Sequence, residues 1–592
     1  MNLKHILIFL TLLSYNSYAQ IVVKGKVTNW MNAPLLGSIQ IEENNYSTTS
    51  DSLGNFLVQI EEFGNYNLQF TEAKTVHSFE INIYDSLDYI IIKTPNHDEE
   101  NQLDELVIHS YQNENYRDKG LISKETYTPT FFKKTAQSNV FESLSMVNGV
   151  KPKVNCGVCS TGDIHINGLE GPYTFVLIDG MPLVSGLSTV YGLSGIPNQL
   201  IEKVEVIKGP ASSVYGSEAI GGMINIITKN PKLASKWSAD SFTTSWGEVN
   251  TDVGLSSPLG KNAHWLLGVN YFNYSNPIDN NKDGFTDLTI QDRISLFQKI
   301  EFYRISKKQF SIATSYYYED RWGGQMNWNN NHRGSDQVYG ESIYTNRWEL
   351  LGLYELPTIE NIKIQTSLIG HDQNSMYGTT SYKAKQNIFF GQMIWHKNIK
   401  NHQLTSGIAH KYQYYNDNTV ATTTAENTHL SSLYIQDEWQ ISSKWSTLLG
   451  ARLDYHSVHK WIPTPRFALK YESVKGDIIR INTGTGFRVV SIFTEDHAAL
   501  SGSREIIIDG NLKPEKSLNT NLSYLKQWFS KNHIMYQLET SVWYTYFSNA
   551  ILPNYDIDPN KIFYSNLNGN SISKGVNINL DIMLPNDIKA VI

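Results

Sequence analysis

The only two thiols of the chain lie three residues apart, at Cys156 and Cys159. In an oxidising compartment such a pair predicts a disulfide. The pair also suits a soft metal such as copper or zinc, with His165 as a third ligand. Two thiols alone do not complete a four-ligand zinc site. A disulfide and a metal site therefore both stay open at this stretch, which runs directly into Asp163 and His165.

A second group of residues spaces oxygen ligands as a calcium loop does. Oxygen-bearing side chains alternate and a glycine follows them, in the order Asp279, Asn281, Asp283, Gly284 and Asp287. Ca²⁺ prefers oxygen ligands and needs such a glycine turn. The twelfth position is Ile290 rather than Glu, so the motif is not an EF-hand. We therefore keep two alternatives, a structural Ca²⁺ site and a solvated acidic loop, and expect no other cofactor.

The glycine-rich stretch from Val204 to Lys229 has the general layout of a phosphate loop. A P-loop requires G-x-x-x-x-G-K-[ST], yet Gly209 has no glycine five positions later and no lysine follows Gly222. The spacing G-x-G-x-x-G of dinucleotide sites is also missing. The glycines are better explained by tight backbone packing.

Enzymatic chemistry finds little support in the sequence. His97-x-x-Glu100 matches a metallopeptidase zinc pair, but it lies in the acidic stretch 96–102 and has no third ligand in view. A solvated charge run explains it better. The chain carries no G-x-S-x-G motif, no H-E-x-x-H motif and no paired-carboxylate constellation, so we expect no enzyme.

The first 19 residues predict export. Lys4 precedes an apolar run over 6–13, and Ser17-Tyr18-Ala19 resembles a cleavage site, as in a signal peptide. No later run reaches about 18 consecutive apolar residues, which argues against a membrane helix. The chain has 49 basic and 57 acidic side chains, which gives a net charge of −8 and argues against nucleic-acid binding.

The elements that position these residues are mostly strands. Short strands and the turn 51–54 predict a β-sandwich over 20–95. A helix is expected over 139–147, and a hairpin is expected around Asp179-Gly180. After about residue 233 the pattern alternates with period two, as in 362–368 and 538–546. Together with an aromatic content of 12%, this favours a membrane β-barrel over a soluble sandwich.

Several motifs resemble known families. Gly25-Lys26-Val27, the run 34–37 and Asp51-x-x-Gly54-x-Phe56 resemble the carboxypeptidase-regulatory-like domain. The stretch 201–229 resembles the plug signature of TonB-dependent outer-membrane receptors, and 166–186 resembles the plug strands before it. LDELVIHS at 103–110 resembles the TonB box. Residues 465–467, 486–488 and 512–517 match barrel motifs of the siderophore, haem and cobalamin receptor group.

The resemblance implies an all-β dominated chain in the outer membrane of a Bacteroidetes-type Gram-negative cell. It implies a signal peptide (1–19), a periplasmic sandwich (20–95), a linker with the TonB box (96–117), a plug (118–232) and a transmembrane barrel (233–592). Family barrels have 22 strands, whereas about 360 residues supply near 18 strands at about 20 residues each. The chain is therefore expected to lack its last strands.

The resemblance also implies a function and partners. The chain would import a scarce ligand, with a ferric siderophore first and cobalamin, haem or copper as alternatives. TonB and its inner-membrane energising complex would drive this import by proton-motive force, and the barrel would stand in outer-membrane lipid as a monomer. The alternative is a barrel-anchored surface receptor that binds or signals without transport.

Site residues follow from the same resemblance. The residues expected to bind TonB by strand addition are Asp104, Glu105, Leu106, Val107 and Ile108. The expected ligand-facing plug loop contains Cys156, Cys159, Asp163, His165 and Glu170. A barrel loop carrying Arg321, Trp322, Asn327 and Trp328 is expected to stack on a planar ligand, with aromatics of the membrane interface as the alternative.

Overall fold

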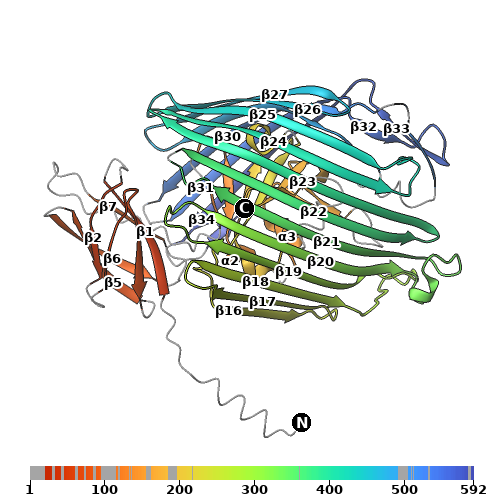
Figure 1. Ribbon diagram of the computed structural model, residues 1–592, viewed down its shortest axis with the longest axis horizontal. Helices are drawn as coiled ribbons and strands as arrows, with labels where there is room; N and C mark the ends of the chain where they lie inside the picture. The colour runs from red at the N-terminus through yellow and green to blue at the C-terminus, as the bar shows by residue number, and fades with distance from the viewer. Residues whose placement is uncertain are drawn as a thin grey trace, which may run out of the picture. The chain divides into compact units, whose positions relative to one another are not determined.

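The computed structural model (Figure 1) describes most of the chain. The described residues are 21–29, 34–41, 46–60, 64–72, 75–83, 89–94, 115–117, 120–132, 134, 137–154, 162–183, 196–216, 218–358, 360–490, 492, 504–508, 510, 512–530, 534–584 and 589–591. The chain divides into two compact units, Met1–Glu114 and Asn115–Ile592.

The first unit is a β-sandwich. One sheet has the order β4-β1-β7 and the other has the order β3-β2-β5-β6. Side chains of both sheets, such as Phe56 and Phe70, share one buried core. The predicted turn is present, because the Asp51 Oδ1 atom accepts hydrogen bonds from the backbone N–H groups of Leu53 and Asn55. The strands are β1 (Ile21–Asn29), β2 (Ser38–Ile41), β3 (Tyr46–Thr49), β4 (Asn55–Ile60), β5 (Gly64–Glu72), β6 (Thr75–Ile83) and β7 (Tyr89–Thr94).

The second unit begins with a small α+β domain within residues 115–232, which we call the plug. Its main sheet has the order β13-β12-β15-β14-β9-β8, and β10 pairs with β11. The strands are β8 (Asn115–Arg117), β9 (Lys124–Tyr127), β10 (Val150–Val154), β11 (Gly162–Ile166), β12 (Thr174–Ile178), β13 (Met181–Leu183), β14 (Ile201–Lys208) and β15 (Gly222–Thr228). The helical turns are α2 (Pro129–Phe132), α3 (Val140–Ser143), η1 (Leu144–Met146), η2 (Gly171–Tyr173), η3 (Asn198–Leu200) and α5 (Ser212–Tyr215).

Local sequence explains two of these elements. The Asn139 side chain accepts a hydrogen bond from the backbone N–H of Glu142 at 3.0 Å, and the Glu142 carboxylate reaches back to Ser138. This capping box starts the predicted helix, which the structure divides into α3 and η1. The predicted hairpin joins β12 and β13 through Asp179 and Gly180, whose φ angles of 50° and 77° suit a tight two-residue turn.

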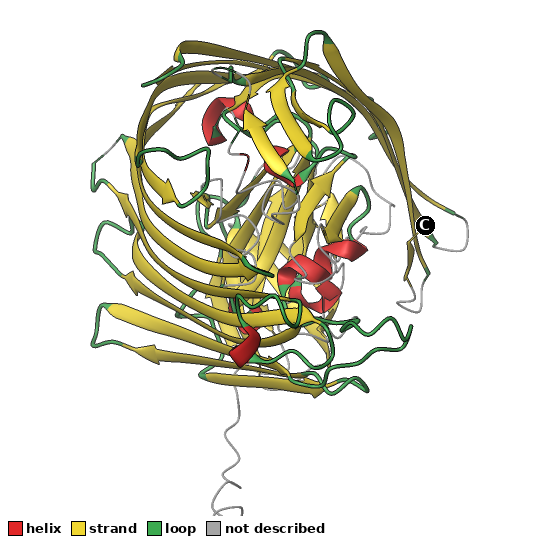
Figure 2. Cartoon of the chain, turned by 90° about the vertical axis from the view of Figure 1, so that its right-hand side faces the viewer, coloured by secondary structure: helices red, strands yellow, loops and turns green. Residues whose placement is uncertain are grey.

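After the plug, the chain forms one 17-stranded sheet that runs from β16 to β35. Each strand pairs antiparallel with the next, and Figure 2 shows this wall curving around the plug. The strands are β16 (Trp237–Thr243), β17 (Val249–Pro258), β18 (Ala263–Tyr274), β19 (Ile290–Phe302), β20 (Phe310–Gly324), β21 (Gly340–Glu355), β22 (Asn361–Tyr377), β23 (Thr380–Ile399), β24 (His402–Asp417), β25 (Glu426–Gln440), β26 (Trp445–His456), β27 (Lys460–Glu472), β28 (Ile478–Arg488), β30 (Glu515–Phe529), β31 (Met535–Ser548), β34 (Asn570–Met583) and β35 (Lys589–Val591).

Burial on this wall runs opposite to that of a soluble sheet. The apolar residues Leu368, Val542 and Tyr544 are 39%, 44% and 44% exposed, whereas Gln365 and Ser367 are buried. A soluble sandwich would bury the apolar face instead. Apolar residues outside and polar residues inside are the arrangement of a barrel in lipid. Within the residues that the structure describes, no helix is both long and apolar enough to cross a membrane.

The two ends of the wall differ in their connections. At one end short turns join the strands, as at 259–262, 400–401 and 441–444, whereas long loops such as 275–289, 325–339, 489–514 and 549–569 occur at the other end. Short turns face the periplasm in outer-membrane barrels and long loops face outward. Loop 325–339 contains η4 (Asn330–His332). The last two long loops also pair into a small sheet of β29 (Glu505–Ile508), β33 (Lys561–Asn566) and β32 (Ile551–Asn554).

Candidate functional site

The glycine-rich stretch is a contact between plug and wall. Gly222 has a φ of +152°, and a Cβ atom there would lie 2.3 Å from the carbonyl oxygen of Ile207. Side chains of the wall hydrogen-bond to the backbone of this stretch, because Asn482 donates to the Pro210 carbonyl at 3.1 Å and Asn519 donates to the Ile220 carbonyl at 2.9 Å. The stretch is thus tightly packed, as the sequence predicts, and its backbone accepts hydrogen bonds from side chains of the wall.

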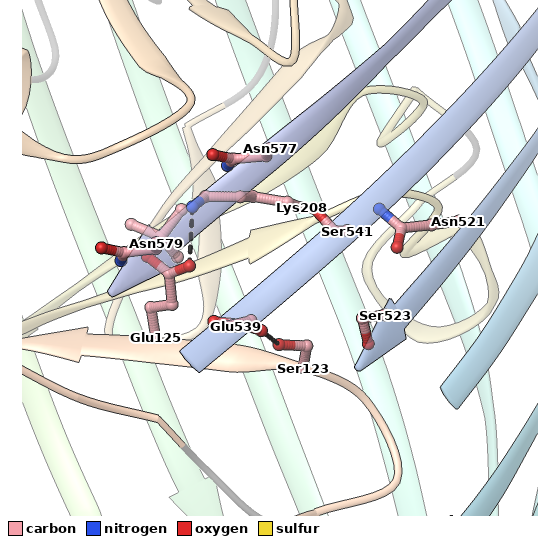
Figure 3. A pocket seen from close by; sticks show the side chains of 10 residues that line it. Ser123, Glu125, Lys208, Asn521, Ser523, Glu539, Ser541, Asn577 and Asn579 are labelled. Atoms are coloured by element: carbon pink, nitrogen blue, oxygen red, sulfur yellow. Dashed lines mark hydrogen bonds and ion pairs between the residues drawn. The ribbon is translucent and has the colours of Figure 1, made fainter. Parts of the chain in front are cut away.

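A polar cavity lies between the plug strands β9 and β14 and the wall strands β30, β31 and β34 (Figure 3). Its volume of about 20 Å³ is enough for one water molecule. Across it, Ser123 of the plug donates a hydrogen bond to Glu539 of the wall at 2.7 Å. Beside it, the Lys208 ammonium lies 2.6 Å from the Glu125 carboxylate. The hydrogen bond therefore fastens the plug to the wall here, and the ion pair joins β9 to β14 within the plug.

Glu205 on β14 extends this charged cluster within the plug. Its carboxylate lies 3.0 Å from the Lys203 ammonium and 3.3 Å from the Lys124 ammonium. Burial raises the pKa of Glu205, but the two ammonium groups outweigh that effect, so its pKa falls below the ordinary value. The carboxylate therefore stabilises the plug most in its ionised form.

Near the outer end of the wall, one buried carboxylate joins the plug, the wall and an outer loop. The Glu515 carboxylate is fully buried and lies 2.7 Å from the Arg488 guanidinium. It also accepts hydrogen bonds from the Tyr173 hydroxyl of the plug at 3.0 Å and from the Ile551 backbone N–H at 2.7 Å. We call Tyr173, Arg488, Glu515 and Ile551 the hub.

Apolar contacts reinforce the hub. The Tyr173 ring lies 4.9 Å from the Phe547 ring, and both belong to a buried cluster with Leu169, Ile220 and Ala550. The Arg488 guanidinium lies over the Tyr173 ring at 4.4 Å, which adds a cation–π contact. The plug segment 169–173 is thus fixed to the base of the outer loop 549–569.

The small sheet of the two long loops packs against the inner wall. Ile551, Ile562 and Tyr564 of this sheet share a buried cluster with Tyr377, Tyr382 and Tyr415, which belong to the distant strands β22, β23 and β24. Since the loops leave from β28 and β31, the small sheet spans part of the barrel mouth. A ligand that enters from outside would meet this cover first.

The structure brings together part of the predicted plug loop. Asp163 and His165 lie on β11, with 2.8 Å between the His165 Nε2 atom and an Asp163 carboxylate oxygen. A Cβ atom on Gly171 would lie 2.2 Å from the Asp163 Cβ atom, so the segment around the exposed Glu170 passes close to this pair. Cys156 and Cys159 lie outside the described residues, and so do Asp104, Glu105, Leu106, Val107 and Ile108. Ligand and TonB contacts at all these residues stay predictions.

The residues predicted on a barrel loop separate into two groups. Arg321 and Trp322 belong to the end of β20 rather than to the loop, and the Arg321 side chain is buried 3.4 Å from Glu319. Trp328 is also buried, with its ring 4.7 Å from that of Trp322. Asn327 is the exposed member of the set. Stacking of a planar ligand on these rings stays a prediction.

The predicted calcium residues are exposed, apart from the half-buried Asp279, and their side chains hydrogen-bond to the backbone of their own loop. The Asp279 carboxylate accepts hydrogen bonds from the N–H groups of Asp283 and Gly284, and Asp287 accepts one from Asn280. Asn281 donates from its side chain to Asp283 at 2.9 Å. Across the described part of the chain, no three or more His, Cys, Asp or Glu side chains gather to hold a metal ion. Calcium at this loop stays a prediction.

Sequence reasoning missed the roles of the hub and of the polar cavity. Arg488 and Glu515 belong to barrel motifs that resemble those of the receptor group, but the resemblance predicts no role for either residue. A signal was present on β30, where Glu515, Ser517 and Asn519 alternate with the outward Leu518 and Leu522. A charged residue on the inward face of a barrel strand must find a partner in the lumen.

Comparisons with known proteins agree with this architecture. Residues 239–585 match the family model of the TonB dependent receptor-like β-barrel, and residues 119–223 match that of the TonB-dependent receptor plug domain. An iron-regulated outer membrane virulence protein of Vibrio cholerae serotype O1 is 24% identical over 436 residues, which cover 68% of this chain and 62% of the relative. The chain thus spans less than two thirds of the length of the curated relatives it matches.

Solved structures show the same fold. The siderophore receptor PirA from Acinetobacter baumannii matches with a TM-score of 0.60 and 16% identity, over 78% of each chain. The copper transporter OprC matches with a TM-score of 0.62 and 12% identity, over 81% of this chain and 78% of OprC. Because the barrel model alone covers more than half of the sequence, this chain belongs to the TonB-dependent receptor family of the Gram-negative outer membrane.

Proposed function

We propose that the chain imports a metal chelate, with a ferric siderophore as the first candidate, and that TonB supplies the energy. The observation that carries this proposal is the plug itself. It fills the inner side of the wall and is fastened through hydrogen bonds and ion pairs on several strands. A chelate cannot cross unless these contacts are released.

The energy needed for release supports an external source. Opening the hub breaks the hydrogen bond from the Tyr173 hydroxyl of the plug to the buried Glu515 carboxylate, and a hydrogen bond to a charged group contributes about 1.5–3 kcal/mol. Several further plug–wall hydrogen bonds add about 1 kcal/mol each. Ligand binding alone is a poor source for this work, since energy used to open the plug would be lost from affinity. Pulling by TonB on residues 103–110 would supply it.

The choice of ligand follows from the relatives. One solved neighbour is named a siderophore receptor and another a copper transporter, and the curated relative is named as iron-regulated. The fold is one of receptors and transporters, which favours transport over enzymatic chemistry.

Two measurements on one strain test the proposal. Deletion of residues 103–110 should abolish uptake of a ferric catecholate siderophore while leaving its binding to whole cells unchanged. Cobalamin, haemin and a copper salt form parallel arms of the assay. Uptake that survives the deletion contradicts energised transport. Binding without uptake in the intact protein would favour the non-transporting receptor instead.

A further inference from the structure

Two histidines meet on the outer face of the barrel wall, away from the plug. His410 lies on β24 and His429 lies on β25, where Tyr412 pairs with His429 and Ser431 pairs with His410. The two histidines are therefore diagonal neighbours across the strand pair, within reach of each other. The Nε2 atom of His410 lies 3.5 Å from the Nδ1 atom of His429. From this geometry we propose that the pair binds a divalent transition-metal ion.

The distance between the nitrogens suits a shared metal. A metal ion binds imidazole nitrogen at about 2.0–2.1 Å. Two such nitrogens lie about 3.3–3.4 Å apart on a tetrahedral ion and about 2.9 Å apart at neighbouring positions of a tetragonal ion such as Cu²⁺, and the 3.5 Å in this chain is slightly longer than both. Only a small side-chain movement is needed to close the site.

The surrounding residues orient both rings. The His410 Nδ1 atom lies 2.9 Å from the Ser431 hydroxyl oxygen. When Nδ1–H donates to that oxygen, the lone pair of Nε2 points toward His429. In metal sites, a hydrogen-bond partner of the ligating histidine fixes its tautomer in the same way. The Tyr412 ring packs 5.0 Å from the His429 ring, and its hydroxyl donates to Asn427 at 2.7 Å. Both ligands are therefore held before a metal arrives.

The pair lies at the outer edge of the membrane band. His429 is ten residues from Trp439 along β25, and Trp439 lies beside the short turn 441–444 at the other end. Ten residues span about 33 Å along a strand, or about 23 Å across a membrane at a tilt of about 45°, close to the apolar band of about 25 Å. The exposed His429 thus stands at the level where lipid headgroups and water begin.

The chemistry selects the ion. Imidazole suits Cu²⁺, Ni²⁺ and Zn²⁺, and Cu²⁺ binds most tightly in the usual order of affinities, whereas Mg²⁺ and Ca²⁺ prefer oxygen. Within the described residues no third His, Cys, Asp or Glu joins the pair. Water or a headgroup oxygen would complete the coordination. The site is independent of the import proposal, because none of its residues faces the lumen contacts described above.

Copper titration of the purified full chain, without an affinity tag and with Cys156→Ser and Cys159→Ser, tests the proposal. Electron paramagnetic resonance should detect one Cu²⁺ bound through two nitrogens, and His410→Gln with His429→Gln should remove that one equivalent. Ser431→Ala should lower the affinity about 10-fold or more. His402→Gln is the matched control, because His402 lies at the other end of the same strand pair, 2.7 Å from Asp437, and should leave the stoichiometry unchanged.

Three results would overturn the site. The first is an unchanged number of bound copper ions in the double variant, with folding verified by circular dichroism. The second is the lack of any binding in the parent protein. The third is that Mg²⁺ displaces bound Cu²⁺ as well as Ni²⁺ does, since two imidazoles bind Ni²⁺ more tightly than Mg²⁺.

Discussion

Glu515→Gln should loosen the contact between the plug and the outer loop 549–569. Glutamine keeps the shape of the side chain, but its single acceptor oxygen can serve only one of Tyr173 and Ile551, which donate to different oxygens of Glu515, and it removes the charge that faces Arg488. The two side chains are 0% and 7% exposed, so water offsets little of that loss. Loss of one partner from a buried ion pair costs about 3–5 kcal/mol. At about 1.4 kcal/mol per tenfold, the hub should open between about 100-fold and a few thousand-fold more often.

Hydrogen exchange at the Ile551 amide measures this opening directly, because that N–H is bonded to the Glu515 carboxylate. Its exchange rate should rise by the same factor, and so should that of Gly221, whose N–H is bonded to the Tyr173 carbonyl. Glu505→Gln serves as the control, since Glu505 pairs with Lys561 on the same loop sheet but is 61% exposed. Adding Arg488→Met to Glu515→Gln should restore part of the protection, because the buried charge is then gone. Unchanged exchange in Glu515→Gln, or a double variant that opens more than the single one, would refute the reasoning.

Other predictions concern the plug alone. Gly222→Ala should destabilise the plug strongly, because its Cβ would lie 2.3 Å from a backbone oxygen. Gly168→Ala is the control within the plug, since Gly168 also has a positive φ but an added Cβ there would meet nothing within 4 Å; protease resistance of the plug compares the two variants. Glu205→Gln should lower plug stability at pH 7, because the native pKa is depressed, so the ionised carboxylate stabilises the plug above its unfolded pKa of about 4.5. That difference should shrink as the pH falls through the native pKa, and urea unfolding at a series of pH values checks it; a constant difference would mean that charge is not the cause.

The strands of the wall could be predicted from sequence because period two survives in any antiparallel sheet. Alternation alone cannot say which face of the sheet meets lipid. The structure answers that question, because the apolar Val542 and Tyr544 are exposed and the polar Gln365 is buried. The hairpin at Asp179-Gly180 and the cap at Asn139 were also predictable, since both depend on neighbours in sequence. The hub was not, because Tyr173 and Glu515 are 342 positions apart and their contact depends on how the whole barrel curves.

The plug is fastened differently on its two sides, and this should decide where it loosens first. Toward β18–β21 it shares an apolar core with Leu266, Phe297 and Leu351. Toward β28–β31 hydrogen bonds such as that of Ser123 with Glu539 stand beside the smaller apolar cluster of Tyr173 and Phe547. Water can replace a hydrogen bond at a net cost of only about 0.5–1.5 kcal/mol, but it cannot replace apolar contacts. In a background without Cys156 and Cys159, Ser123→Cys should therefore react with maleimide at lower urea than Leu200→Cys, which lies in the apolar core. The reverse order would mean that the polar side holds the plug more firmly.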